Sequence, residues 1–211
     1  MAAAPSAAIS TSHRTLSTGC AFWTAHAALP DPISRQGSAV LARLNSNRLR
    51  ELDGFLSHLL ADILSAAGVP QPEAPKALRE TSTLRRLRKA ERLFGLDLGA
   101  QPRLIAAQRA AAALRRPSGT FCKERLREDL RRAADLPETR GGNAPCQLDE
   151  KTIKALCGFY RSLGDVLVDA LARRGDMSGN DTGAGPATEQ ITCETASRDD
   201  SIFRESGAHR F

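Results

Sequence analysis

The residues best placed to do chemistry in this sequence are five cations in the segment LRRLRKAERLF, which spans residues 84–94. At 100° per residue, the apolar residues of this segment fall in one arc together with Glu91, and the basic residues occupy the opposite arc. Only Leu93 interrupts the basic arc. We therefore expect one face of a helix to pack and the other to form a basic binding surface. Its members are Arg85, Arg86, Arg88, Lys89 and Arg92.

A basic face of this kind suits an acidic ligand. Each phosphate that it neutralises on a nucleic acid releases counterions, so affinity would fall steeply with added salt. An acidic protein is the alternative ligand, and a solvated face or one docked on the acidic end of the chain are further alternatives. The aromatic residues that stack single-stranded bases do not alternate with these cations, and the sequence has no helix-turn-helix signature.

Charge is unevenly distributed along the 211 residues, whose net charge is +6. Residues 79–132 hold 15 basic and 6 acidic side chains, a local net charge of +9, whereas residues 176–211 hold 7 acidic and 3 basic ones, a net charge of −4. A pI near 9.4 is compatible with an acidic partner without requiring one. The sequence thus places a basic centre before an acidic tail.

Residues that would favour an enzyme are few. His58 and Asp62 lie one turn apart on an expected helix, but two ligands alone make no metal site. Cys157 falls on an expected core face, where a thiol is usually inert, and Cys122 has no evident neighbouring base. The five cysteines contain no C-x-x-C pair, so neither a disulfide framework nor a zinc ribbon is indicated. We assign no catalytic residue, metal ligand or cofactor.

Composition favours helices as the elements that carry these residues. Hydrophobic residues make up 41% of the chain but aromatics only 4%, so alanine and leucine, both strong helix formers, must provide most of the core. The sequence predicts an all-α bundle of four to six helices with disordered N- and C-terminal tails.

Apolar periodicity and the positions of Pro and Gly give the helix boundaries. The triplet Asn45-Ser46-Asn47 is poor helix material, so the first helix is expected to be kinked or split in two. The last helix carries the clearest apolar stripe, from Ile153 to Leu171, and Gly175 is placed to end it. The expected helices cover residues 34–67, 82–94, 103–116, 120–136 and 149–174.

The domain organisation follows from these elements. Residues 1–32 are expected to form a disordered leader, 33–175 the helical domain and 176–211 a disordered acidic tail. Residues 1–30 contain a single basic residue, Arg14, and whether they form a targeting segment stays open. No apolar stretch reaches the ~18 residues that a membrane span needs, so we expect a cytoplasmic protein with no membrane association.

The sequence therefore favours a non-enzymatic helical interaction module with a basic face. A divergent all-helical enzyme such as a nuclease is one alternative, with His58 its best candidate residue. A partner-stabilised subunit is another, in which the stripe of the last helix is buried in a second chain. The oligomeric state is left open.

Overall fold

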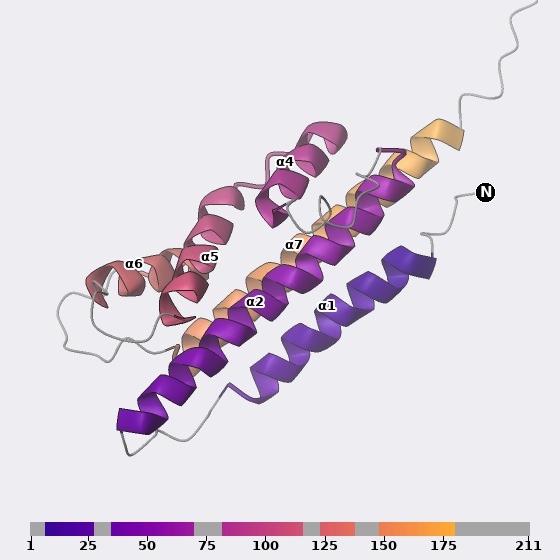
Figure 1. Cartoon of the computed structure of the whole chain (residues 1–211). Helices are drawn as coiled ribbons and strands as arrows, with labels where there is room; N and C mark the ends of the chain where they lie inside the picture. Colours follow the sequence, from indigo (N-terminus) through magenta and orange to yellow (C-terminus); the bar gives the residue numbers. More distant parts are fainter. Residues whose placement is uncertain (1–6, 28–34, 70–81, 116–122, 138–147, 180–211) are drawn as a thin grey trace, which may run out of the picture. The chain divides into compact units, whose positions relative to one another are not determined.

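The computed structural model describes residues 7–27, 35–69, 82–115, 123–137 and 148–179. Within these ranges every regular element is an α-helix (Figure 1), as the composition predicts. The predicted kinked or split first helix, α2, is a single element. The helices are α1 (Ala7–Ala25), α2 (Arg35–Ala66), α4 (Thr83–Phe94), α5 (Gln101–Arg115), α6 (Lys123–Ala134) and α7 (Glu150–Gly179).

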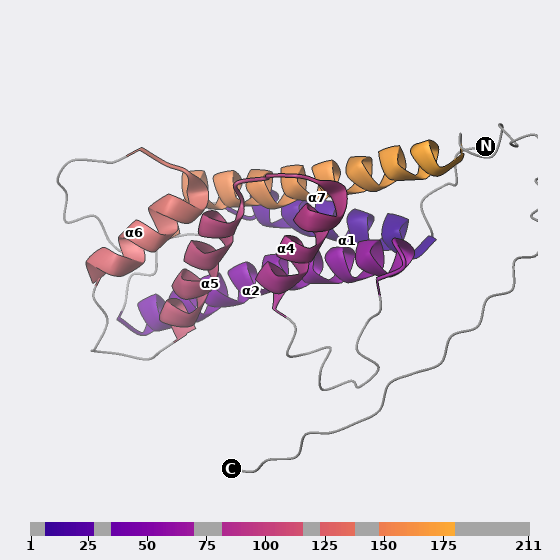
Figure 2. The same cartoon turned by 90° about the horizontal axis from the view of Figure 1, so that it is seen from above.

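The three longest helices lie side by side and the three shorter ones cover one side of them. Helices α1, α2 and α7 contact one another. Helix α4 packs on both α2 and α7, α5 packs on α2, and α6 packs on α7 (Figures 1 and 2). Helix α1 contacts none of the shorter helices within the described residues. One continuous cluster of buried side chains, mostly leucine and alanine, joins all six helices.

Helix α7 follows its sequence pattern closely. The Asp149 side chain accepts a hydrogen bond from the backbone N–H of Thr152 at 2.7 Å, which caps the first turn. The predicted stripe is buried, with Leu163 5% and Leu167 0% exposed, and it is covered by helices of the same chain. The helix runs past Gly175, the predicted end, to Gly179. The chain after Gly179 lies outside the described residues.

Helix α2 stays continuous through the triplet that is expected to kink or split it, because two of the three polar side chains there have partners. Asn45 and Ser46 are each only 1% exposed. The Ser46 hydroxyl donates to the carbonyl oxygen of Ala111 on α5 at 2.8 Å, and Asn45 Oδ1 accepts from the Arg48 guanidinium at 3.3 Å. These contacts satisfy groups that would otherwise compete with the helix backbone.

The prediction of a disordered leader over residues 1–32 is wrong for its described part, because Ala7–Ala25 form α1. Ile9, Leu16 and Cys20 of this helix are at most 2% exposed, so the segment offsets its ordering entropy by burial against α2 and α7. The sequence signal was weak, since three apolar residues among many Ala, Ser and Thr make a narrow stripe.

Glycines allow α1 to approach its neighbours closely. A Cβ at position 164 would lie 2.6 Å from Leu16 Cδ2, and a Cβ at position 19 would lie 2.5 Å from Phe55 Cε2. Each glycine therefore makes a notch that a side chain from another helix fills. Polar contacts add to these, since His13 Nε2 lies 2.7 Å from Asp165 Oδ1.

The C-terminal end of α1 is held by Arg48 of α2, whose side chain is 3% exposed. Its guanidinium donates to the carbonyl oxygen of His26 at 3.0 Å and lies 4.8 Å from the centre of the Trp23 ring. A cation at this point complements the negative end of the helix dipole. Burial lowers the pKa of Arg48.

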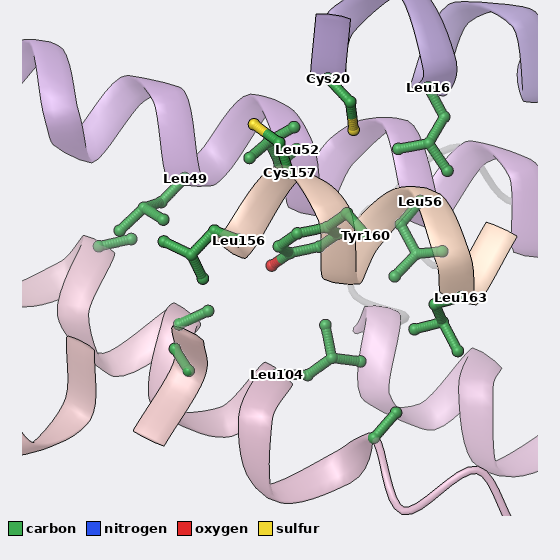
Figure 3. Packing of buried hydrophobic residues seen from close by; sticks show 14 of the residues in the cluster. Leu16, Cys20, Leu49, Leu52, Leu56, Leu104, Leu156, Cys157, Tyr160 and Leu163 are labelled. Carbon is green, nitrogen blue, oxygen red and sulfur yellow. The ribbon is translucent and has the colours of Figure 1, made fainter. Parts of the chain in front are cut away.

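Tyr160 of α7 is the largest fully buried side chain, and its hydroxyl has no hydrogen-bond partner among the described residues. Figure 3 shows the ring among Leu56, Leu104 and Leu156, which offer no acceptor. Burial raises the pKa of the phenol well above its usual value. The ring of Tyr160 thus fills space in the core and stabilises the fold, whereas its unpaired hydroxyl destabilises it.

Replacing Tyr160 with phenylalanine is therefore expected to stabilise the fold by about 1 to 3 kcal/mol, because the change removes the desolvated hydroxyl and keeps the ring. Urea denaturation of both proteins measures the difference. Tyr160→Leu is the matched control, since it removes the hydroxyl but also ring volume and should destabilise. A loss of stability in Tyr160→Phe would show that the hydroxyl has a partner.

Candidate binding surface

Helix α4 carries the predicted basic face, and its ends form as the sequence predicts. Ser82 is the N-cap, with its hydroxyl accepting from the backbone N–H of Arg85 at 3.3 Å. Gly95 ends the helix with φ 64°, a left-handed conformation that glycine adopts without strain.

Polar contacts fix α4 on α2 and α5. Asp53 of α2 accepts hydrogen bonds from Thr83 at 2.9 Å and from Gln108 at 3.1 Å, so one carboxylate joins three helices. Burial raises the pKa of Asp53, and the two hydrogen bonds oppose that shift. The apolar side of α4 is closed by Leu87 and Ala90, both fully buried.

Four of the five predicted cations are exposed, namely Arg85, Arg88, Lys89 and Arg92. They follow the i, i+3, i+4, i+7 spacing, so they form one stripe about 10 Å long on the helix surface. None of the four takes part in the ion pairs that the described residues make. We call these four residues the basic stripe.

The fifth cation, Arg86, was predicted on the exposed face and is instead 7% exposed. Its Nη1 donates to the backbone carbonyl and the hydroxyl of Ser57 on α2. Burial lowers the pKa of this guanidinium. Arg86 lies at the edge of the basic arc, where a long side chain can reach across to a neighbouring helix, so it is a packing residue.

Arg88 of the basic stripe is held in place by a short chain of hydrogen bonds. Gln101 of α5 donates from Nε2 to Glu91 at 2.6 Å, and its Oε1 accepts from Arg88 Nε at 2.8 Å. Glu91 is 7% exposed, as expected from its place in the apolar arc. The Gln101 amide therefore lies between the buried Glu91 carboxylate and the exposed Arg88 guanidinium. Arg88 makes no direct ion pair with Glu91, so its positive charge stays on the surface.

Helix α7 adds charge next to this surface. Arg174 is exposed, and its Nη1 donates to the carbonyl oxygen of Leu93 at 2.9 Å. This contact satisfies one of the carbonyl groups at the C-terminal end of α4. Arg173 beside it is also exposed.

Two basic residues at the contact of α5 with α6, Arg132 and Arg103, behave differently. Arg132 pairs with Glu128 at 2.8 Å, at the i,i+4 spacing that suits a helix surface. Arg103, facing α6 from α5, donates to the Ala133 carbonyl and lies 4.0 Å from the centre of the Phe159 ring. Arg132 and Arg103 each form an ion pair within the bundle, whereas no residue of the basic stripe does so among the described residues.

A second surface, between α1 and α2, was not anticipated from the sequence. It is a hollow of about 440 Å³, and Phe22 at its edge is 50% exposed. The single tryptophan of the chain, Trp23, contributes to it, which makes its fluorescence a probe of this region. The lining residues are Arg14, Thr15, Thr18, Gly19, Phe22, Trp23, Glu51 and Phe55.

The residues considered for catalysis are not assembled into a site. His58 is exposed, and Asp62 accepts a hydrogen bond from Ser12 on α1 instead of pairing with it. Within the described ranges, no three His, Cys, Asp or Glu side chains are grouped closely enough to hold a metal ion. Cys122 lies outside those ranges, and Cys157 is buried in the core as predicted.

The fold and surface define an all-helical bundle with an exposed basic stripe on one of its shorter helices. The chain matches no protein-family model, no curated protein and no solved structure. Among the described helices, none combines the length and the apolar content that crossing a membrane requires.

Proposed function

We propose that this protein is a non-enzymatic interaction module that binds a nucleic acid through its basic stripe. The observation that carries the proposal is the exposure of Arg85, Arg88, Lys89 and Arg92 on one face of a helix whose opposite face is buried. Four adjacent like charges repel one another, so binding of an anionic ligand lowers the electrostatic free energy of this surface.

The form of the stripe suits a phosphate backbone. Its length of about 10 Å corresponds to the rise of roughly three nucleotide steps along the axis of a duplex, at 3.4 Å each. Arginine binds phosphate through two parallel hydrogen bonds, and three of the four cations are arginines. Because α4 is capped and fixed to α2 and α5, the cations are held on a preformed element.

Sequence-specific recognition is not part of the proposal. Contacts to phosphates position a protein on nucleic acid without reading its bases, and the stripe offers no aromatic side chain for stacking. Affinity should therefore depend on salt more than on sequence.

Reversing the charge of Arg85, Arg88 and Arg92 together to glutamate is expected to lower affinity for any oligonucleotide by roughly 100-fold or more at low salt. The slope of log affinity against log salt should fall by about one for each lost phosphate contact. Fluorescence titration with two unrelated duplexes and one single strand, at several salt concentrations, measures both quantities. Helicity should change little, because the three side chains project away from the core.

A second triple variant separates a local effect from net charge. Arg125 on α6 and Lys151 and Arg161 on α7 are also exposed, so their reversal changes the net charge equally without touching the stripe. This control should keep most of the affinity. If the unmodified protein binds none of the oligonucleotides at low salt, the nucleic-acid proposal is wrong, and an acidic protein partner becomes the hypothesis to test.

A further inference from the structure

Two cysteine thiols from distant parts of the sequence meet in the core. Cys20 on α1 and Cys157 on α7 are 2% and 1% exposed, and both are free thiols. Each thiol is the first influence on the pKa of the other, so the two side chains are neighbours. Figure 3 shows both at the junction of α1 with α7.

The surroundings make the two sulfur atoms chemically unequal. The hydrogen bond from Cys20 lowers the pKa of Cys157, a hydrogen bond with Thr24 and the charge of Arg48 act in the same direction, and burial opposes them. The same thiol–thiol hydrogen bond and burial raise the pKa of Cys20. Cys157 is therefore the more acidic thiol of the pair, and the more acidic thiol is the better candidate for the attacking sulfur.

Small oxidants can reach the pair if α1 separates from its neighbours. Within the described residues α1 contacts only α2 and α7, so its opening leaves the packing of α4, α5 and α6 intact. Local opening of a helix at the edge of a bundle costs less than global unfolding.

We infer that Cys20 and Cys157 are an oxidisable dithiol that forms an intramolecular disulfide between α1 and α7 on exposure to a peroxide. The Cys157 thiol loses its proton, the thiolate attacks one oxygen of hydrogen peroxide, and the O–O bond breaks. The released hydroxide takes up that proton, which yields a sulfenic acid at Cys157 and one water. The Cys20 sulfur then attacks the Cys157 sulfur and the S–O bond breaks. The Cys20 proton leaves with the hydroxide as a second water, so two thiols are oxidised and one peroxide is reduced.

The test uses the full chain with Cys122, Cys146 and Cys193 replaced by serine, so that only the buried pair can react. Hydrogen peroxide is expected to remove both free thiols, lower the intact mass by about 2 Da and yield a peptide joining residues 20 and 157. Closing so long a loop should raise Tm by roughly 5 to 15 °C, and dithiothreitol should reverse the rise.

Single variants in the same background test the order of the steps. Cys20→Ser should accumulate a sulfenic acid on Cys157 that dimedone traps, whereas Cys157→Ser should give no adduct at Cys20 within the same time. If circular dichroism shows that the buried serine disturbs folding, Cys20→Ala is used instead. It should give the same adduct on Cys157 more slowly, because it removes the interaction that lowers the pKa of Cys157. Two free thiols that persist after peroxide treatment, or disulfides found only between chains, would overturn the inference.

Discussion

Replacing Leu167 with alanine is expected to lower the free energy of unfolding by about 2 to 5 kcal/mol, because the side chain is fully buried and its loss leaves a cavity in a packed helical core. Leu163, one turn earlier on the same stripe and 5% exposed, should give a loss in the same range. Urea denaturation followed by circular dichroism measures both.

Val40 on α2 provides the control for this prediction. It is an apolar residue that is 66% exposed, so Val40→Ala should change stability by no more than about 0.5 kcal/mol. If Leu167→Ala also cost less than about 0.5 kcal/mol, the stripe of α7 would not be buried in the isolated chain. A second chain would then be needed to cover it.

The second large effect is expected from two glycines on α7 that have opposite surroundings. At Gly164 an added Cβ would press on Leu16 Cδ2 at 2.6 Å and on Leu59 Cδ2 at 3.3 Å, whereas at Gly158 nothing lies within 4 Å of it. Gly158→Ala should therefore stabilise the protein by roughly 0.5 to 1 kcal/mol through helix propensity. Gly164→Ala should destabilise it by roughly 1 to 3 kcal/mol through overpacking.

The same variant reports on the docking of α1. Because Leu16 fills the notch at Gly164, adding Leu16→Ala to Gly164→Ala should recover part of the loss, and a double-mutant cycle measures the coupling. Trp23 emission should shift to longer wavelength if α1 separates. Equal stability changes at Gly158 and Gly164 would contradict the close contact between α1 and α7.

The sequence predicted the elements whose burial depends on many apolar residues or on clear end signals. The three-and-four spacing of apolar residues was enough to predict the buried face of α7. The ends of α4 were predicted correctly from Ser82 and Gly95, because helix capping depends on local sequence. The all-α class also followed from composition and periodicity, whereas the helix ranges read from periodicity did not include α1.

Other features depend on long-range packing, which periodicity does not contain. Helix α1 was missed because it docks through glycine notches and a few apolar residues, and the notch at Gly164 forms 148 positions after Leu16. Arg86 was assigned to the surface because a helical wheel gives a direction for its Cβ but not for the end of a long side chain. The partner that decides its position, Ser57, lies on another helix.

The side-by-side arrangement of α1 and α7 also bears on how the protein is made. Leu16 and Cys20 reach their partners only after the ribosome has added Cys157 and Gly164. At ~5 to 20 residues per second, the nascent helix waits roughly 7 to 30 seconds with its apolar stripe incompletely covered. Once α2 has been synthesised, it is the only one of the two contact helices present for the rest of that interval, so α2 alone covers the apolar side chains of α1.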